Sequence, residues 1–440
     1  MRLGQERPLG LYSQERMTPK FAIAILISLA AAACTTPQEA AQPPESGDSA
    51  LVETAAPPGD LPVLRSESLG VAETTTTVQP SPEPSIAPAM LAQLTTEEKV
   101  GQLFMPVVVG NSATDVTPAE AQANTQLFGV STPAEVVDRF HLGGIIYLTQ
   151  NIKAANQVGA FSAGLQDSAG SVGSGIGLLI AVDQEGGRVN RITDGVTVFP
   201  PAALLSGDTD AVREAGYLTG TQVAVQGVNV VLAPVADVTA TGAEGAIGNR
   251  SYGDNPAVVS EMVRAAIDGI QGSGVAAAVK HWPGHGSTRI DSHENLPVLD
   301  ISRSEWEQRD QVPFRAAIDE DVAIVLVGHL ALPSVDPDGD PAIVSSVLID
   351  EILRGDLGFD GVVMTDALNM GAVAGFNQAE LSVNAVLAGA DILLVPPDLP
   401  ASYAAVLSAV GDGRISAERL DDATLRVLNL KEQLGLLPIS

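Results

Sequence analysis

The sequence predicts an α/β fold in which short parallel strands alternate with helices. Eight apolar runs recur at regular spacing over the last 350 or so residues. Val, Ile and Leu follow one another in these runs without polar alternation, which is typical of parallel strands covered on both faces. Eight such units in about 300 residues fit a (β/α)8 barrel of the TIM type, and periodicity alone leaves a doubly wound sheet as the alternative.

The predicted strands follow one another along the chain. They cover 104–109, 144–148, 178–182, 230–234, 275–279, 323–327, 361–365 and 391–395. Between them, 256–271 and 379–388 carry apolar residues that recur at three and four positions, as one face of a helix requires. No internal repeat divides this region, so its length suits one large domain better than two.

Polar side chains collect where the predicted strands end. Asp183 follows the third strand, Lys280 and His281 follow the fifth, His329 the sixth and Asp366 the seventh. In a barrel the carboxyl ends of all strands surround one mouth, so residues far apart in the sequence become neighbours. The pattern therefore predicts an active site, although Asp366 taken alone also fits a helix N-cap.

The densest group of chemically active residues lies between 280 and 293. The segment reads Lys-His-Trp-Pro-Gly-His-Gly and is followed by Asp291, Ser292 and His293. It holds three of the five histidines of the chain, and its Pro-Gly pair excludes an ordinary helix. A rigid loop after a buried strand is where α/β proteins carry functional groups.

This loop resembles the signature of glycoside hydrolase family 3, specifically of its single-domain β-N-acetylglucosaminidases (β-hexosaminidases). Three further motifs agree in order: Asp-Gln-Glu-Gly-Gly-Arg-Val-Asn-Arg from 183, Asn-Arg-Ser-Tyr from 249 and Met-Thr-Asp-Ala-Leu-Asn-Met from 364. The resemblance covers roughly residues 90 to 435. It favours the barrel, as a single catalytic domain over 89–440, and implies a retaining enzyme that removes terminal GlcNAc from peptidoglycan-derived muropeptides.

The resemblance implies catalytic roles for three residues. Asp366 would be the nucleophile, forming a covalent glycosyl-enzyme so that configuration is retained. His293 would be the general acid/base, since an imidazole with a pKa of about 6.5 can donate and accept protons near neutral pH. Asp291 would be its dyad partner, which orients the ring and raises its basicity.

The resemblance also implies which residues surround the sugar and bind its hydroxyl groups. These are Asp183, Arg191, Arg250, Lys280 and His281. Glu185 and Arg188 are expected to brace the loop, and His285 to stabilise the turn. Trp282 has two interpretations, stacking on a sugar face or packing within the loop. His329 has no assigned role.

Other functions compete with this one. A metal-dependent barrel hydrolase would also place Lys, His and Asp at strand ends, but no His-x-His follows an early strand, and the Pro-Gly pair between His281 and His285 prevents a helical metal pair. No metal or other cofactor is therefore expected. A non-catalytic lipoprotein that binds wall sugars would be expected to have lost the nucleophile or the loop histidine.

Two alternatives keep the fold and change the chemistry. A histidine acid/base does not repel an incoming phosphate, so a phosphorylase that releases sugar 1-phosphate remains open. β-Glucosidases of the family are larger, and this chain stops soon after the eighth unit, which leaves no room for their second domain.

The first 34 residues are typical of a secretory signal. Arg16 and Lys20 flank the start of an apolar stretch at 21–33, which is too short for an ordinary transmembrane helix. Cys34 is the only cysteine, so no intramolecular disulfide can form. Its position resembles a bacterial lipoprotein cleavage site and predicts lipidation, although Ala31 stands where leucine is usual; a plain signal peptide is the alternative. Met17 is a second candidate start.

Residues 35–88 are rich in Pro, Thr, Ser, Ala and Glu, a composition that cannot offset its ordering entropy and predicts a disordered linker. The formal net charge is −30, with 53 acidic against 23 basic residues, which disfavours nucleic acid and direct adsorption to anionic lipid. We expect a monomeric, extracytoplasmic enzyme attached to the cell membrane through a lipid anchor.

Overall fold

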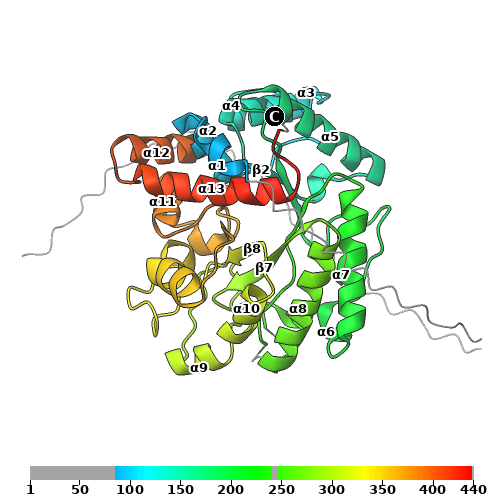
Figure 1. The fold of residues 1–440 in the computed structure, drawn as a ribbon, viewed down its shortest axis with the longest axis vertical. Coiled ribbons are helices and arrows are strands. Elements are labelled where there is room, and N and C mark those ends of the chain that lie inside the picture. Colours follow the sequence, from blue (N-terminus) through cyan, green and yellow to red (C-terminus); the bar gives the residue numbers. More distant parts are fainter. Residues whose placement is uncertain (1–84, 240–244, 439–440) are drawn as a thin grey trace, which may run out of the picture. The chain divides into compact units, whose positions relative to one another are not determined.

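In the computed structural model, the structure describes residues 85–239 and 245–438 (Figure 1). The expected signal peptide over 1–34, its Cys34, and the linker up to residue 84 lie outside these residues. Residues 85–88, assigned above to the linker, contact the last helix: the Ser85 hydroxyl and the Ile86 N–H both donate to the carboxylate of Glu432. The described part therefore begins a few residues before the predicted boundary.

Eight parallel strands occur in the predicted order and at the predicted places. They are β1 (Phe104–Met105), β2 (Gly144–Tyr147), β3 (Leu179–Val182), β6 (Val230–Val231), β7 (Ala276–Trp282), β8 (Ile324–Val327), β9 (Val362–Thr365) and β10 (Leu393–Leu394). A small antiparallel hairpin, β4 (Gln184–Gly186) with β5 (Val189–Asn190), was not predicted.

These strands do not form one closed ladder. Six of them make a parallel sheet in the order β2-β3-β6-β7-β8-β9, and β1 pairs with β10 separately. Only isolated contacts join the pair to the sheet edges, such as the Thr365 N–H to the Ile392 carbonyl at 2.9 Å and the Ile146 N–H to the Pro106 carbonyl at 3.1 Å. The prediction of a closed (β/α)8 barrel is therefore wrong, and the sheet is a curved half-barrel. Pro106, directly after β1, has no N–H to continue a ladder, which is one physical reason.

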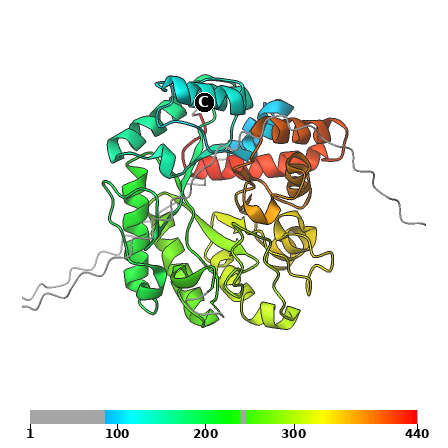
Figure 2. The same cartoon turned by 180° about the vertical axis from the view of Figure 1, so that it is seen from behind.

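Helices follow the strands and lie at the periphery, with the strands inside, in both views of the molecule (Figures 1 and 2). They are α1 (Ala87–Leu91), α2 (Thr96–Gln102), α3 (Pro118–Phe128), α4 (Pro133–Phe140), α5 (Ala155–Ser171), α6 (Ala202–Leu205), α7 (Thr209–Ala224), α8 (Pro256–Gly272), α9 (Arg303–Gln308), α10 (Gln311–Ile318), α11 (Gln378–Leu387), α12 (Leu399–Gly411) and α13 (Ala417–Gln433). Shorter turns are the 3-10 helices η1 (Thr149–Asn151), η3 (Gly248–Arg250), η4 (Ala342–Val344) and η6 (Gly371–Val373), and η5 (Val347–Asp356) is a π-helix.

Three early helices begin with the same sequence signal. Thr95, Thr117 and Thr132 are the N-caps of α2, α3 and α4. Each threonine hydroxyl accepts a hydrogen bond from the N–H of a glutamate three residues later, and that glutamate carboxylate accepts from the threonine N–H. This reciprocal capping box satisfies two donors that a helix start otherwise leaves without partners.

The strands bury both of their faces. Alternate strand residues point to opposite sides of a sheet, and in β3 Leu179 and Ala181 belong to one apolar cluster while Ile180 and Val182 belong to another. The first cluster takes side chains from all eight parallel strands and fills the inside of the curve. The second lies between the strands and the helices. This double burial explains why the strands appear in the sequence as continuous apolar runs.

Helices α7 and α8 lie side by side in both views (Figures 1 and 2). Their contact depends on glycines: a Cβ at Gly269 of α8 would lie 2.2 Å from the Arg213 carbonyl oxygen, and one at Gly216 of α7 would lie 2.9 Å from the Ala266 carbonyl oxygen. The two backbones thus approach more closely than any larger residue allows.

Over residues 85–239 and 245–438, no helix combines the length and apolarity needed to cross a membrane.

Candidate active site

In three strands, the series of side chains that point to the inside of the curved sheet ends in a charged residue. Asp183, Lys280 and Asp366 each stand two positions beyond an inward-facing residue of β3, β7 and β9. Because side chains alternate along a strand, these three continue the apolar interior into polar groups at the carboxyl ends. Lys280 and His281 were expected on the loop after the strand, but both lie within β7, whose register with β8 shifts between Lys280 and Trp282.

A largely buried network of ion pairs connects β7 with the end of β3, with β4 and with η3. Lys280 Nζ lies 2.8 Å from Asp183 Oδ1 and 2.6 Å from Glu185 Oε1. Arg250 donates two hydrogen bonds to Glu185, from Nε at 2.7 Å and from Nη2 at 2.8 Å. This bidentate geometry fixes the guanidinium plane. Glu185 therefore braces the site, as expected, and holds two cations in place.

The electrostatics of this network favour the charged forms of Glu185 and Lys280. Burial alone would raise the pKa of Glu185, but the Lys280 and Arg250 cations outweigh burial and hold that pKa well below its ordinary value. Burial would lower the pKa of Lys280, yet the Asp183 and Glu185 carboxylates raise it. A buried cation paired in this way cannot lose its partner without a large cost in stability.

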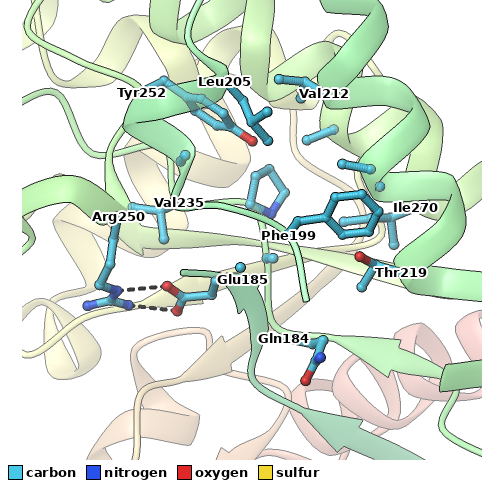
Figure 3. A pocket seen from close by; sticks show the side chains of 17 residues that line it. Gln184, Glu185, Phe199, Leu205, Val212, Thr219, Val235, Arg250, Tyr252 and Ile270 are labelled. Atoms are coloured by element: carbon cyan, nitrogen blue, oxygen red, sulfur yellow. Dashed lines mark hydrogen bonds and ion pairs between the residues drawn. The ribbon is translucent and has the colours of Figure 1, made fainter. Parts of the chain in front are cut away.

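A cavity of about 50 Å³ lies beside the Glu185–Arg250 pair, among strand ends, α7 and α8 (Figure 3). Figure 3 shows apolar side chains such as Phe199, Val212 and Ile270 around it. Ordinary ligand pockets measure roughly 300 Å³ or more, and a sugar needs polar partners for its hydroxyl groups. The cavity is therefore too small to be the sugar site.

Asp237, which the sequence analysis did not single out, orients His281. The His281 Nδ1–H donates to Asp237 Oδ2 at 2.7 Å, while Asp237 Oδ1 accepts from the N–H groups of His281 at 3.3 Å and His285 at 2.6 Å. Asp237 is fully buried; burial would raise its pKa, but His281 and these hydrogen bonds lower it. This arrangement leaves His281 Nε2 as the acceptor facing Arg250 Nη2 at 3.4 Å.

Asp366 follows β9 directly and is held by its backbone. Its N–H donates to the Val327 carbonyl at 2.8 Å, and its Oδ1 accepts from the Ala367 N–H at 2.8 Å. The next regular helix, α11, begins only at Gln378, so Asp366 is not a helix N-cap. Burial would raise the pKa of Asp366, but the nearby His329 and His281 rings, the Ala367 N–H and Lys280 lower it. The carboxylate is therefore ionised, as a nucleophile requires.

His329 supports the residue that follows Asp366. It is fully buried, and its Nε2–H donates to the Ala367 carbonyl at 2.9 Å. Burial lowers its pKa, so the ring is neutral near pH 7. Its Nδ1 has no hydrogen-bond partner among the described residues. The sequence placed His329 at a strand end without a role, and the structure places it against the segment that follows Asp366.

Asp291 and His293 form a dyad on the loop after β7. Asp291 Oδ1 accepts from the His293 Nδ1–H at 2.8 Å and from the His293 N–H at 3.0 Å. Burial would raise the pKa of Asp291, but these hydrogen bonds and the His293 ring lower it. The His293 side chain is 66% exposed, so its Nε2 is free to face a ligand at the mouth.

Two neighbouring residues, His285 on this loop and Trp282 at the end of β7, have structural roles. His285 is buried and hydrogen-bonded to the Ser292 hydroxyl at 3.1 Å and the Thr288 hydroxyl at 2.8 Å, which stabilises the turn as expected. Trp282 is fully buried, and its Nε1–H donates to the Leu348 carbonyl at 3.1 Å. Packing within the protein is thus the correct interpretation for Trp282, and sugar stacking is wrong.

The two arginines of the β4–β5 hairpin differ in their surroundings. Arg191 Nη2 lies 3.5 Å from Asp183 Oδ2, and its side chain is partly exposed. Arg188 reaches the carbonyl oxygens of Ala246 and Ile247 at 3.5 and 3.4 Å, which agrees with a bracing role. Asp183 therefore lies between two cations, Lys280 and Arg191.

These residues together provide an ionised carboxylate, an exposed imidazole with a carboxylate partner, and fixed cations. Such a set suits acid/base and nucleophilic chemistry on a polar substrate. Over the residues that the structure describes, no three His, Cys, Asp or Glu side chains are grouped so that they could hold a metal ion.

Comparison with known proteins shows which family the chain resembles. Residues 95–430 match the model for the Glycosyl hydrolase family 3 N terminal domain. A β-hexosaminidase from Xylella fastidiosa (strain 9a5c) is 36% identical over 279 residues, 61% of this chain and 81% of that protein. A β-N-acetylglucosaminidase/β-glucosidase from Cellulomonas fimi is 31% identical over 357 residues, 79% of this chain and 59% of that protein.

Among solved structures, a glycoside hydrolase family 3 β-N-acetylglucosaminidase from Paenibacillus sp. str. FPU-7 superimposes with a TM-score of 0.71 and 38% identity, over 79% of this chain and 64% of that one. The chain thus spans less than two thirds of the length of the Cellulomonas and Paenibacillus proteins. Since the family match extends over most of the sequence, the chain belongs to glycosyl hydrolase family 3.

Proposed function

We propose that this protein is a retaining exo-β-N-acetylglucosaminidase that hydrolyses terminal β-linked GlcNAc from peptidoglycan-derived muropeptides through a covalent glycosyl-enzyme. The observation that carries the proposal is the presence of an ionised, partly buried Asp366 after β9 together with an exposed Asp291–His293 dyad on the loop after β7. The β-hexosaminidase and β-N-acetylglucosaminidase names of the relatives support the sugar.

In the first step, an Asp366 carboxylate oxygen attacks the anomeric carbon as the glycosidic bond breaks. Protonated His293 gives its Nε2 proton to the departing oxygen, so the leaving group departs as an alcohol. Asp291 accepts the Nδ1–H bond throughout and thereby stabilises the charged ring. The Asp366 ester retains the sugar in the site.

In the second step, neutral His293 takes a proton from water as the water oxygen attacks the anomeric carbon. The bond to Asp366 breaks and the carboxylate is regenerated. Two displacements at one carbon give net retention of configuration. The first step needs Asp366 ionised, which its surroundings favour, and the second step restores that carboxylate.

The substrate-binding roles belong to the cations and acids around this pair. Asp183 would accept hydrogen bonds from sugar hydroxyls, and Lys280, Arg191, Arg250 and His281 would donate to hydroxyl oxygens or fix the groups that do. Asp183, Lys280 and Arg250 are already held in one ion-pair network. Preorganised groups of this kind lose little freedom when the ligand binds.

Two alternative activities would use the same site, those of a phosphorylase and of a β-glucosidase. The exposed His293 carries no negative charge that would repel phosphate, so phosphate could replace water as the acceptor. The name of the Cellulomonas relative includes β-glucosidase activity. Product analysis separates these reactions. The protein is incubated with aryl N-acetylglucosaminide and aryl glucoside, with and without phosphate.

Free GlcNAc as the main product in both buffers is the expected result. Sugar 1-phosphate in phosphate buffer would identify a phosphorylase, and preference for the glucoside would identify a glucosidase. No turnover of any glycoside would favour the non-catalytic sugar-binding lipoprotein. Anomer analysis by NMR should show the β-product first.

The nucleophile assignment has its own test. A 2- or 5-fluorinated activated sugar slows the second step and should trap an ester on Asp366, identified by mass spectrometry of the digested protein. Asp366→Asn should lower turnover by about a thousandfold or more, because the attacking oxygen charge is lost while the shape remains. A label on another residue would contradict the assignment.

We also propose an extracytoplasmic location, with Cys34 as the lipid attachment point and GlcNAc-containing wall fragments as the substrate at hand. The support is the order of basic, apolar and small residues before Cys34, which lies outside the described structure. The net charge of −30 makes direct adsorption to anionic lipid unfavourable, so a covalent anchor would be needed for attachment.

A further inference from the structure

The dyad does not by itself fix where His293 stands. The imidazole is 66% exposed, and its one hydrogen-bonded partner among the described residues is Asp291, two positions away on the same loop. A partner on the same loop moves with the loop. The distance from His293 to Asp366 must therefore be set by whatever holds the loop backbone.

Two backbone hydrogen bonds hold this part of the loop. The Gly371 N–H donates to the His293 carbonyl at 3.1 Å, and the Ala372 N–H donates to the Ser292 carbonyl at 3.0 Å. Both donors lie at the start of η6, five and six residues after Asp366. The backbone of the acid/base loop is thus attached to the segment that carries the nucleophile.

The contact at Gly371 leaves no room for a side chain. A Cβ there would lie 2.5 Å from the His293 carbonyl oxygen and 2.6 Å from the Glu294 carbonyl oxygen. Both are backbone atoms, so no rotamer change can relieve the clash. A methyl group at this position would displace the loop or break the two hydrogen bonds.

We propose that Gly371 is a positioning residue that sets the separation between the His293 imidazole and the Asp366 carboxylate by seating the loop backbone on η6. This inference rests on the proposed role of His293 as acid/base. It assigns no contact with substrate to Gly371. Its effect on the reaction passes through His293 alone.

The test compares Gly371→Ala with Gly375→Ala. Gly375 lies four residues further along the same segment, and a Cβ there would meet nothing within 4 Å. Both variants and His293→Ala are assayed on a GlcNAc disaccharide and on an aryl N-acetylglucosaminide with a highly acidic phenol, with and without azide. Circular dichroism and melting temperature monitor folding.

A displaced acid/base should harm poor leaving groups most, because they depend on its proton. We expect Gly371→Ala to lower kcat/KM on the disaccharide by about tenfold or more and on the activated glycoside by less than about threefold. Azide should accelerate the second step on the activated glycoside and release glycosyl azide. Gly375→Ala should behave like the unchanged protein in every assay.

Ala372→Pro provides a second variant in case Gly371→Ala folds poorly. It replaces the N–H that donates to Ser292 with a ring carbon, so it displaces the loop backbone at the hydrogen bond next to the Gly371 contact. It should give a weaker form of the same leaving-group dependence. If both variants show this leaving-group dependence, displacement of the loop and not general damage to the fold is the cause.

The outcomes are distinguishable. If His293→Ala shows strong leaving-group dependence and Gly371→Ala matches Gly375→Ala, the positioning role is wrong while the proposed function stands. Equal loss on both substrates in Gly371→Ala would also overturn it, because that pattern implicates Asp366 or the fold. If His293→Ala itself lacks leaving-group and azide effects, the acid/base assignment fails and the inference fails with it.

Discussion

At the scale of single residues, Asp237 shows how one buried acid controls a neighbour. It accepts the Nδ1–H of His281 and two backbone N–H groups, so the tautomer of His281 and the course of the β7 end depend on it. The Nε2 atom of that tautomer is an acceptor, which suits the Arg250 donor beside it. A change of one oxygen to nitrogen would reverse this arrangement.

We therefore expect Asp237→Asn to lower kcat/KM by about 10- to 100-fold, the worth of a charged hydrogen bond of roughly 1.5 to 3 kcal/mol. The amide NH₂ would donate to Nδ1, the proton would move to Nε2, and two donors would then face each other at Arg250. Steady-state kinetics measure the loss. Asp391→Asn, a buried acid near the start of β10 that pairs with Arg354, should lower stability without this kinetic effect. Unchanged kcat/KM in Asp237→Asn would contradict the expected role.

The sequence could indicate the charged residues of the site but not their partners. Asp183, Lys280 and Asp366 interrupt apolar runs, which is a local signal. Lys280 meets Asp183 across 97 positions and His281 meets Asp237 across 44, and no local pattern encodes such pairings. Asp237 could have been noted, because it too follows a predicted strand, but its role depends on His281 being inside β7. The burial of Trp282 depends on distant packing partners as well.

At the scale of elements, the close packing of α7 and α8 depends on small residues. We expect Gly269→Ala to destabilise the fold by about 1 to 3 kcal/mol, because its methyl group would meet the Arg213 backbone and force the helices apart. Gly272→Ala, at the end of the same helix, meets nothing within 4 Å. It should stabilise by up to about 1 kcal/mol through helix propensity.

Urea unfolding of the two variants and the unchanged protein measures these differences. Equal stability changes in Gly269→Ala and Gly272→Ala would mean that the two helices can separate without cost. The pair of substitutions is matched in helix, residue type and direction, so helix propensity cancels in the comparison.

The strands and helices themselves were largely predictable from the sequence, because strands that bury both faces consist of continuous apolar residues. The helices expected at 256–271 and 379–388 are α8 and α11. The β4–β5 hairpin was not predictable, since Gln184–Gly186 carries no apolar alternation and is held by the Gln184 side chain on the Ile192 backbone. Closure of the sheet was wrongly predicted, because apolar runs report burial and not the length of each hydrogen-bonded ladder.

At the scale of the whole molecule, stability depends on one buried lysine side chain that is removed from solvent. Lys431 of α13 is fully buried, and its Nζ donates to Gln102 Oε1 of α2 at 2.6 Å. Burial lowers the pKa of Lys431 from 10.5 to about 7. Between these values the unfolded chain holds a proton that the folded chain does not, so stability should increase as pH rises from about 7 to about 10.5.

Lys431→Met should remove this dependence. The variant should be more stable than the unchanged protein by roughly 3 to 5 kcal/mol near pH 7 and below, less the lost hydrogen bond to Gln102, and the difference should shrink towards pH 10. Urea midpoints at pH 6, 8 and 10 measure it. A difference that is constant with pH would show that Lys431 keeps its proton in the folded state.

The anchoring proposal also concerns the whole molecule. If Cys34 carries two acyl chains, attachment should be stable, since one chain alone gives only marginal binding. Cys34→Ser should release the protein into the medium or leave it unprocessed, as judged by membrane fractionation and intact mass. Membrane association that is unaffected by the substitution would rule out this anchor.

The uneven exposure of the histidine rings makes His293 the ring that a reagent in solution should reach first. His281, His285 and His329 are at most 7% exposed and His141 is half-buried, whereas the His293 ring faces solvent. An imidazole-acylating reagent should therefore titrate the enzyme: the first acyl group taken up should fall on His293 and abolish disaccharide cleavage. Hydroxylamine should restore activity, and bound GlcNAc should slow the labelling. Peptide mapping after one equivalent would count active molecules in any preparation.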